Sequence, residues 1–469
     1  METILSLVNA INSLLWNSLL LVLLLGTGIF FTIRLKFIQV RKLKEGFQLV
    51  FGNFSSKSSK KQKREEGEMT PFQALATAIA SQVGTGSLTG VATALIGGGP
   101  GAIFWMWLSA FFGMATIYSE ATLAQKYKTT VNGEVTGGPV YYIQQAFHGK
   151  GGKVMAAIFA VFITLALGFM GNMVQSNSIG TAFSEVFGNR NVSVSPVVIG
   201  ILVAAMAGFI FLGGTDRLAS VVEKFVPFMA FVYIIGSLIL IVSHIIALPE
   251  AVKMIFVSAF QPKAILGAGA GITVREAIRF GVARGLFANE AGMGSTPHAH
   301  ARAKAKNPHE QGLVAMVSVF IDTFIVLNLT VFAILTTGVL DSGKEGIALT
   351  QLAFMESFGS MGDIFVAICL FFFAFSTILG WHFFGKVNVE YLFGKKSGKF
   401  YSLLVLLFIV IGSTLKLNVV WALSDLFNGL MVVPNVLALL ALSGVVVTIC
   451  KKHGTKKEKV VEKENVVLE

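Results

Sequence analysis

The chain has 469 residues, of which 54% are hydrophobic and only 13% are charged, and its formal net charge is +12. Soluble domains are usually about 25% charged, so this composition excludes a set of soluble domains and indicates a polytopic membrane protein. The basic residues lie between apolar runs, which argues against a nucleic-acid partner. Both cysteines, Cys369 and Cys450, lie in apolar stretches, so the sequence offers no disulfide framework and no cysteine metal cluster.

Eleven apolar segments are long enough to be candidate spans, since a bilayer core needs roughly 20 apolar residues in helical form. They lie near 12–33, 71–96, 101–124, 154–177, 196–213, 225–247, 275–296, 312–338, 362–385, 401–415 and 419–450. The last is too long for one straight helix and contains Pro434. We expect it to be either one kinked span or a surface helix followed by a short span.

The basic residues predict the orientation of these spans. If the N-terminus lies outside and the spans alternate, most of the 37 Lys and Arg residues fall in cytoplasmic segments. This is the bias that membrane proteins show. We therefore expect an odd number of spans in the cell membrane, with the N-terminus outside and the C-terminus in the cytoplasm.

Glycine interrupts the second and the seventh candidate spans in the same way. Residues 81–87 read SQVGTGS, and residues 289–295 read NEAGMGS. The two segments are five spans apart, so they cross the membrane in opposite directions. This combination is typical of transporters built from inverted repeats. The alternatives are a chance match or glycines that only allow close helix packing. A phosphate-binding loop is excluded because no strand and no Lys-Ser/Thr pair accompanies either segment.

Unwound helices expose backbone groups that suit a charged small molecule. Free N–H groups at a helix N-terminus bind carboxylates. Free carbonyls bind an ammonium group or a dehydrated Na⁺, and such irregular backbone is tolerated at membrane depth only where it lines a cavity. The two interrupted spans therefore predict a site for a zwitterionic amino acid and Na⁺.

The ninth candidate span carries two adjacent hydroxyls, Ser376 and Thr377, with Trp381 one turn after Thr377. The hydroxyls could ligate Na⁺ while the indole closes a substrate pocket. Alternatively, each hydroxyl bonds to a carbonyl of its own helix, as is common in membrane helices. In the fourth span, Asn172 and Gln175 share a face, and they either bridge helices or touch substrate.

Ionisable residues inside a membrane are functional candidates by default. For Glu120 and Asp322, a proton or ion role competes with a structural pair to an arginine. Arg284 lies deep in the seventh span, where a structural or gating ion pair is favoured over substrate binding. His298 and His300 have poor spacing for a metal. No catalytic triad or cofactor motif is present, so we do not expect an enzyme.

Several motifs resemble the alanine or glycine:cation symporter family, which is the sodium:alanine symporter family. They are TPFQAL at 70–75 leading into GTGS at 84–87, GGGPG at 97–101, GLFANEAGMGS at 285–295, GGP at 137–139, the tyrosine pair 141–142 and GW at 380–381. The resemblance covers about 12–450.

The resemblance implies an all-α membrane protein with the leucine-transporter type of fold. Two inverted repeats of five helices follow one extra N-terminal helix, for about 11 transmembrane helices in all. The expected parts are an external N-terminus and first helix at 1–33, a basic cytoplasmic loop at 34–69, a first repeat at 70–247, an external loop at 248–274, a second repeat at 275–450 and a basic cytoplasmic tail at 451–469.

The resemblance also implies a function and a site. The protein would import a small neutral amino acid, alanine or glycine, with Na⁺ by alternating access. Residues matching the substrate site are Gly84, Thr85 and Gly86 at the carboxylate, with Gln82, Gln175, Phe287, Asn289 and Trp381 as pocket walls. Residues expected at Na⁺ are Ser81, Thr85, Ser376 and Thr377. No cofactor and no metal other than Na⁺ is expected.

Four alternatives remain at this point. The protein could prefer glutamine, which some members of the family do. Protons could replace Na⁺, carried by Glu120 or Asp322. A passive channel would need a continuous polar pore in place of two opposed broken helices. A membrane enzyme would need His298, His300, Glu290 and Asp322 to converge.

Overall fold

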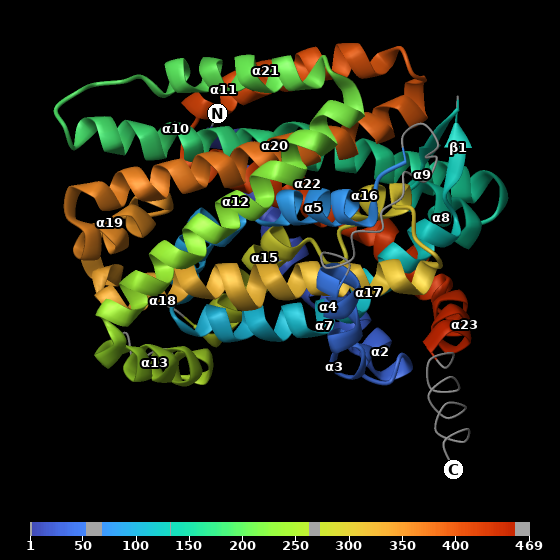
Figure 1. The fold of residues 1–469 in the computed structure, drawn as a ribbon, viewed down its shortest axis with the longest axis horizontal. Helices are drawn as coiled ribbons and strands as arrows, with labels where there is room; N and C mark the ends of the chain where they lie inside the picture. The colour runs from blue at the N-terminus through green and yellow to red at the C-terminus, as the bar shows by residue number, and fades with distance from the viewer. Residues whose placement is uncertain (1, 53–67, 132, 262–272, 455–469) are drawn as a thin grey trace.

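The computed structural model describes residues 2–52, 68–131, 133–261 and 273–454. Its long helices run side by side along the horizontal direction of Figure 1. By length and composition, eight helical segments in the described parts of the chain could cross a membrane, or nine if one bent pair counts as a span.

The N-terminal part holds one long apolar helix, then short helices, then the first bent pair. Its helices are α1 (Glu2–Leu14), α2 (Leu20–Arg34), α3 (Ile38–Arg41), α4 (Leu43–Phe51), α5 (Pro71–Gln82), α6 (Val91–Gly98) and α7 (Gly101–Lys126). A π-helical segment, Leu15–Leu19, joins α1 to α2. The N-terminus of α5 is fixed by a capping box, in which Thr70 and Gln73 exchange side-chain and backbone hydrogen bonds.

The middle of the chain contains the only strands in the described residues. The strands β1 (Thr129–Val131) and β2 (Glu134–Thr136) pair antiparallel, with Thr129 opposite Thr136. The helices that follow are α8 (Pro139–Ala146), α9 (Gly149–Ile163), α10 (Asn172–Gly188), α11 (Pro196–Phe211), α12 (Gly214–Ser243) and α13 (Leu248–Phe260). A π-helical segment, Thr164–Gly171, makes α9 and α10 continuous.

The C-terminal part begins with a second interrupted helix. Its helices are α15 (Val274–Asn289), α16 (Pro297–Arg302), α17 (Pro308–Val319), α18 (Asn328–Thr337), α19 (Ile347–Phe358), α20 (Gly362–Phe393), α21 (Ser397–Thr414), α22 (Leu417–Ala441) and α23 (Ser443–Gly454). A π-helical segment, Phe320–Leu327, joins α17 to α18.

The eleven expected spans all correspond to helices, but not all of these helices are long. Eight belong to the long apolar segments, and the span expected at 71–96 is the bent pair. The remaining two are α11 and α15, with 16 residues each. Helix α15 falls short because the chain leaves the helix after Asn289.

The segment 419–450 follows neither expected arrangement. Helix α22 runs for 25 residues with Pro434 in its interior, and the second helix, α23, begins only at Ser443. The apolar spanning helix therefore comes first and the short helix second. Helix α23 ends with Lys451 and Lys452 in its last turn.

Several smaller elements lie outside the eleven expected spans. They include the β1–β2 hairpin, helix α8, helix α19 and helix α13, the last of which lies inside the expected external loop 248–274. In Figure 1, β1, α8 and α23 lie toward one end of the long helices, and α13 and α19 lie toward the other. The expected topology likewise assigns the first group and the second group to opposite sides of the membrane. Which end faces the cytoplasm stays a prediction.

Candidate functional site

The first interruption separates α5 from a π-helical turn, Gly86–Gly90, that leads into α6. The two halves are bent by 42°. The glycines here allow other helices to come close. A Cβ on Gly84 would collide with the hydroxyl oxygen of Thr377 on α20, and a Cβ on Gly86 would lie 2.8 Å from Cα of Ala288 on α15. Two neighbouring helices therefore press against this break.

The second interruption, between α15 and α16, has a different backbone. Glu290, Gly292 and Gly294 all have positive φ angles, of 58°, 93° and 79°. Glycine adopts this region freely, whereas Glu290 is an uncommon non-glycine residue there. The NEAGMGS motif thus produces a compact turn between α15 and α16.

Glu120 on α7 fastens this turn. Its carboxylate accepts hydrogen bonds from the backbone N–H of Gly292 at 3.0 Å and of Gly294 at 2.9 Å. Asn435 on α22 donates to the same carboxylate at 2.6 Å and to the Gly292 carbonyl at 2.9 Å. Glu120, whose role was open, therefore holds the backbone of the second interruption.

The two interruptions lie side by side. Gln82 donates a 2.8 Å hydrogen bond from Nε2 to the carbonyl of Asn289. Ser81 donates to Oε2 of Glu290 at 3.3 Å. Residues about 207 positions apart in sequence are thus in direct contact, and the matched motifs face each other.

Several buried polar atoms have no hydrogen-bond partner among the described residues, and three of them belong to Gln82, Thr85 and Gln175. They are Thr85 Oγ1, Gln82 Oε1 and Gln175 Nε2. The amide of Gln175 is oriented by a bond in which Thr85 N–H donates to Oε1 at 3.1 Å. Because buried polar atoms are nearly always satisfied, such a group of open atoms at one place suits a polar ligand.

Aromatic rings form one wall beside these atoms. Phe287 meets Trp381 edge to face, with ring centroids 5.4 Å apart, and it packs on Trp421 at 4.6 Å. Trp421 was missed by the sequence analysis because nothing in α22 marks its position relative to α15. Trp381, Phe287 and Asn289, three expected pocket walls, are all 2% exposed or less.

The two adjacent hydroxyls on α20, Ser376 and Thr377, make different contacts. Thr377 donates to the Ala80 carbonyl of α5 at 2.8 Å and to the Phe373 carbonyl of its own helix at 3.0 Å. Ser376 donates to the same Phe373 carbonyl at 2.9 Å. Ser376 also lies 3.7 Å from the sulfur of Met229. Thr377 therefore faces the first interruption, and the pair gathers four oxygens from two helices.

Ser81 and Thr85, the other two residues expected at Na⁺, do not contact the oxygens gathered by Ser376 and Thr377 through any hydrogen bond among the described residues. Ser81 donates to the Ala78 carbonyl at 2.8 Å and to Glu290, so its hydroxyl turns toward the second interruption. Thr85 Oγ1 is open and buried, and the Thr85 amide is bonded to Gln175.

Arg284 forms its ion pair with a residue that the sequence did not single out. Its guanidinium makes two hydrogen bonds to the carboxylate of Asp425 on α22, at 2.9 and 2.5 Å, and stacks over Trp421 at 4.2 Å. Pairing of Arg284 with Glu120 or Asp322 is therefore wrong, and the structural ion pair is present with a different partner.

The residues required for an enzyme do not converge. His298 is held by the Ser295 carbonyl and Asn388, at 2.7 and 2.8 Å. His300 interacts with Gln311 at 2.7 Å. Asp322 bonds to Ser87 at 2.7 Å, on the other interrupted helix.

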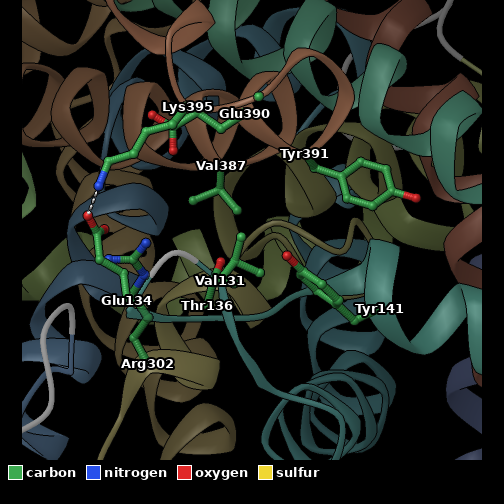
Figure 2. Close-up of a pocket in the computed structure, with 10 residues that line it drawn as sticks. Val131, Glu134, Thr136, Tyr141, Arg302, Val387, Glu390, Tyr391 and Lys395 are labelled. Atoms are coloured by element: carbon green, nitrogen blue, oxygen red, sulfur yellow. Dashed lines mark hydrogen bonds and ion pairs between the residues drawn. The ribbon is translucent and has the colours of Figure 1, made fainter.

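A separate cavity of about 140 Å³ lies away from both interruptions. Figure 2 shows it between the β1–β2 hairpin, α16 and the end of α20. Lys395 donates to Glu134 at 2.8 Å across its edge, and this contact lowers the pKa of the Glu134 carboxyl below its usual range. None of the expected site residues lines this cavity.

The helical fold, with two interrupted helices in contact, is similar to the folds of several transporters of known structure. Among solved structures it is similar to MhsT in complex with L-phenylalanine, with a TM-score of 0.58 and 14% identity over 83% of this chain and 99% of that one. It is also similar to a Na⁺-coupled sialic acid symporter, with a TM-score of 0.54 and 13% identity over 83% and 80%. The fold is thus of the leucine-transporter type.

The chain belongs to the sodium:alanine symporter family, whose family model matches residues 1–467. A relative from Methanococcus maripaludis, the sodium/alanine symporter AgcS, is 42% identical over 94% of this chain and 96% of its own length. The probable sodium/glutamine symporter GlnT of Bacillus subtilis is 40% identical over 95% and 90%. The expected family is confirmed. It is a family of cation-coupled amino-acid transporters and not of enzymes.

Proposed function

We propose that this protein imports a small neutral amino acid, alanine or glycine, together with Na⁺. The observation that carries the proposal is the set of three open polar atoms on Gln82, on Thr85 and on Gln175, whose side chain is bonded to Thr85. The site would alternate between the two sides of the cell membrane, with the C-terminus in the cytoplasm.

The open atoms match the two charges of an amino acid. Gln175 Nε2 and the Thr85 hydroxyl can donate to a carboxylate, beside the backbone of Gly84 and Gly86. Gln82 Oε1 can only accept, so it suits the ammonium group. Donors and an acceptor within one buried group favour a zwitterion over a simple anion or cation.

The wall formed by Phe287, Trp381 and Trp421 would receive the substrate side chain. These rings already pack against one another at 5.4 and 4.6 Å, which favours a methyl group or a hydrogen over a longer side chain. Selection by one or two methylenes is worth only about 1–3 kcal/mol. Glutamine is therefore the competitor that the experiment must include.

The oxygens gathered by Ser376 and Thr377 support a Na⁺ site at the first interruption. The carbonyls of Ala80 and Phe373 and the two hydroxyls are hard oxygen donors, the kind that alkali and alkaline-earth cations prefer. The ion would replace the hydrogen bonds that now join these oxygens. Binding of Na⁺ would thereby fix α5 against α20 and organise the adjacent backbone for the amino acid.

The test is uptake of radiolabelled alanine into proteoliposomes with an inward Na⁺ gradient, compared with an inward K⁺ gradient. We expect uptake above equilibrium only with Na⁺, and stronger competition from glycine than from glutamine. Equal uptake in both salts would contradict Na⁺ coupling, and an added inward proton gradient would then show whether protons drive transport. Stronger competition from glutamine would reassign the substrate.

A further inference from the structure

The first long apolar segment ends at a turn between α2 and α3. This segment, Leu5–Arg34, has 30 residues. At 1.5 Å per residue, a helix of that length reaches across the roughly 40–45 Å of a bilayer with its headgroup regions. Arg34 is also the last residue of α2. We therefore expect the residues that follow Arg34 to lie at the depth of the lipid headgroups.

The backbone of this turn is strained. Lys36 and Phe37 have φ angles of 55° and 56°, in the left-handed region that side chains of this size rarely adopt. Glycine would adopt the same angles without strain. Strained residues persist only where their surroundings hold them, and they gather at functional sites. The turn is thus a candidate for a function that needs these two side chains.

Neighbouring residues hold the turn in its strained form. Leu35 and Ile38, on either side of it, are buried. Arg41 donates from Nε to the Lys36 carbonyl at 2.7 Å and from Nη2 to the Leu35 carbonyl at 3.4 Å. A guanidinium has five N–H donors. The Arg41 side chain therefore closes the turn and keeps further donors for a ligand outside it.

The turn carries a positive charge on its surface. Residues 34–44 include five Lys and Arg residues and no Asp or Glu. Lys42 pairs with Glu45 at 3.0 Å. The other four are exposed, and none of them forms an ion pair with another residue that the structure describes: Arg34, Lys36, Arg41 and Lys44. The charge of these four residues therefore suits an anionic partner.

Apolar side chains are exposed among the basic ones. Ile33, Phe37 and Val40 have 65%, 50% and 62% of their surface exposed. Helix α3 lies at the lower edge of the bundle in Figure 1, below α4 and α7. Surfaces that combine apolar and basic side chains bind where the acyl chains of a bilayer meet its headgroups. An anion in solution would not use the apolar side chains, so the combination favours a lipid.

We propose that the α2–α3 turn binds the headgroup of an anionic phospholipid. The phosphate would accept hydrogen bonds from the open donors of the Arg41 guanidinium, which suits phosphate geometry. Lys36 would add its charge, and Phe37 would contact the acyl chains. Clusters of basic residues directly after a membrane span are typical of binding to anionic lipids. The strained backbone directs both side chains outward toward the same lipid.

The experiment measures the melting temperature of the full-length protein in detergent as phosphatidylglycerol is added, and compares it with phosphatidylcholine. We expect phosphatidylglycerol to raise the melting temperature more. In Lys36→Gln and in Arg41→Gln, the concentration that gives half of this rise should increase about fivefold, because one basic contact is lost. The matched control is Lys399→Gln, the same substitution at an exposed lysine on α21, which should respond like the unmodified protein.

An equal response to the two lipids, or an equal response of all four proteins to phosphatidylglycerol, would overturn the proposal. Arg41→Gln also loses two hydrogen bonds of the turn, so Lys36→Gln decides the test if Arg41→Gln is unstable. Inorganic phosphate should leave the melting temperature unchanged. If it produces the same rise as phosphatidylglycerol, the turn binds a free anion and the lipid assignment is wrong.

A glycine variant tests whether the strain serves the lipid. Lys36→Gly relieves the backbone and removes the charge. We expect it to melt at a higher temperature than the unmodified protein when no lipid is added, and to gain less from phosphatidylglycerol. An undiminished gain in Lys36→Gly would contradict the assignment of this side chain to the lipid.

Discussion

The indole N–H of Trp381 donates a 2.6 Å hydrogen bond to Oε1 of Glu290, which joins the middle of α20 to the turn of the second interruption. Both side chains are 1% exposed or less. The bond fixes the plane of the indole, whose ring also contacts Phe287. An aromatic wall of the proposed substrate site is therefore positioned by a carboxylate that lies outside the group of open polar atoms.

Replacing Trp381 by phenylalanine tests this positioning. The variant keeps an aromatic ring but removes the donor, so Glu290 loses one of its partners. Leaving a buried hydrogen-bonding group without its partner costs about 1–3 kcal/mol, and we expect KM for alanine to rise by about tenfold. Uptake kinetics in proteoliposomes measure the change. A KM equal to that of the unmodified protein would mean that the bond does not position the wall.

The two hydroxyls of α20 should differ in their effect on Na⁺. Thr377→Ala removes the oxygen that contacts the Ala80 carbonyl, whereas Ser376→Ala removes one that bonds only within its helix and near Met229. We expect both variants to need more Na⁺ for half-maximal uptake, with the larger increase for Thr377→Ala. Titration of uptake against Na⁺ gives the comparison, and unchanged Na⁺ dependence in both variants would refute this site.

The glycines of the first interruption should not tolerate a side chain. A valine at Gly84 would collide with Thr377, and a valine at Gly86 would collide with Ala288. We expect Gly84→Val and Gly86→Val to abolish transport while the protein is still inserted. The control is Gly26→Val on α2, where a Cβ would meet nothing within 4 Å. Normal uptake by either of the first two variants would place the functional break elsewhere.

The pair Arg284–Asp425 should contribute to stability. Its two side chains are 5% and 15% exposed, and breaking a buried pair costs about 3–5 kcal/mol because one charge is left alone. We expect Arg284→Met to lower the melting temperature in detergent, and Arg284→Met with Asp425→Leu to recover much of the loss. If the double variant melts as low as the single one, the aromatic stacking on Trp421 and not the charge is responsible.

The contact between Glu134 and Lys395 should respond to acid. Because Lys395 lowers the pKa of Glu134, the contact stabilises the hairpin above the usual carboxyl pKa, and this stabilisation is lost as the pH falls through the lowered value. The pair is partly exposed, so the effect is small. The protection factors of the β1–β2 amides against hydrogen exchange should be unchanged from pH 7 to pH 5, and Lys395→Gln should lower them at pH 7. Equal exchange in both proteins would exclude the contact.

The local signals in the sequence identified the interruptions but not what holds them. The Gly-x-Gly-Ser motifs predict where α5 and α15 end, since glycine both permits positive φ and allows close contact. The hydroxyls of α20 and the Gln175 amide also stood out because polar groups are rare in apolar helices. Each of these residues can be recognised from its immediate neighbours in the sequence, within one turn of helix.

The remaining partners come from distant parts of the chain. Asp425 and Trp421 lie on a helix that the sequence described only as long and apolar, and Asn435 follows a proline that suggested a kink. Their roles depend on how α22 packs against α7 and α15, which no local pattern records. The β1–β2 hairpin was missed because its strands have three residues each, too few to show an alternating pattern.

Because Glu120 binds the turn of the second interruption, the backbone at the two interruptions is held by different numbers of side-chain hydrogen bonds. The turn around Gly292 makes three hydrogen bonds to side chains of two other helices, α7 and α22, and Asn435 also donates to Glu120. The backbone N–H of Thr85 at the first interruption makes one such bond, which it donates to Oε1 of Gln175. Bending the chain at Val83–Thr85 would therefore break fewer backbone bonds to side chains of other helices than bending it at the turn around Gly292.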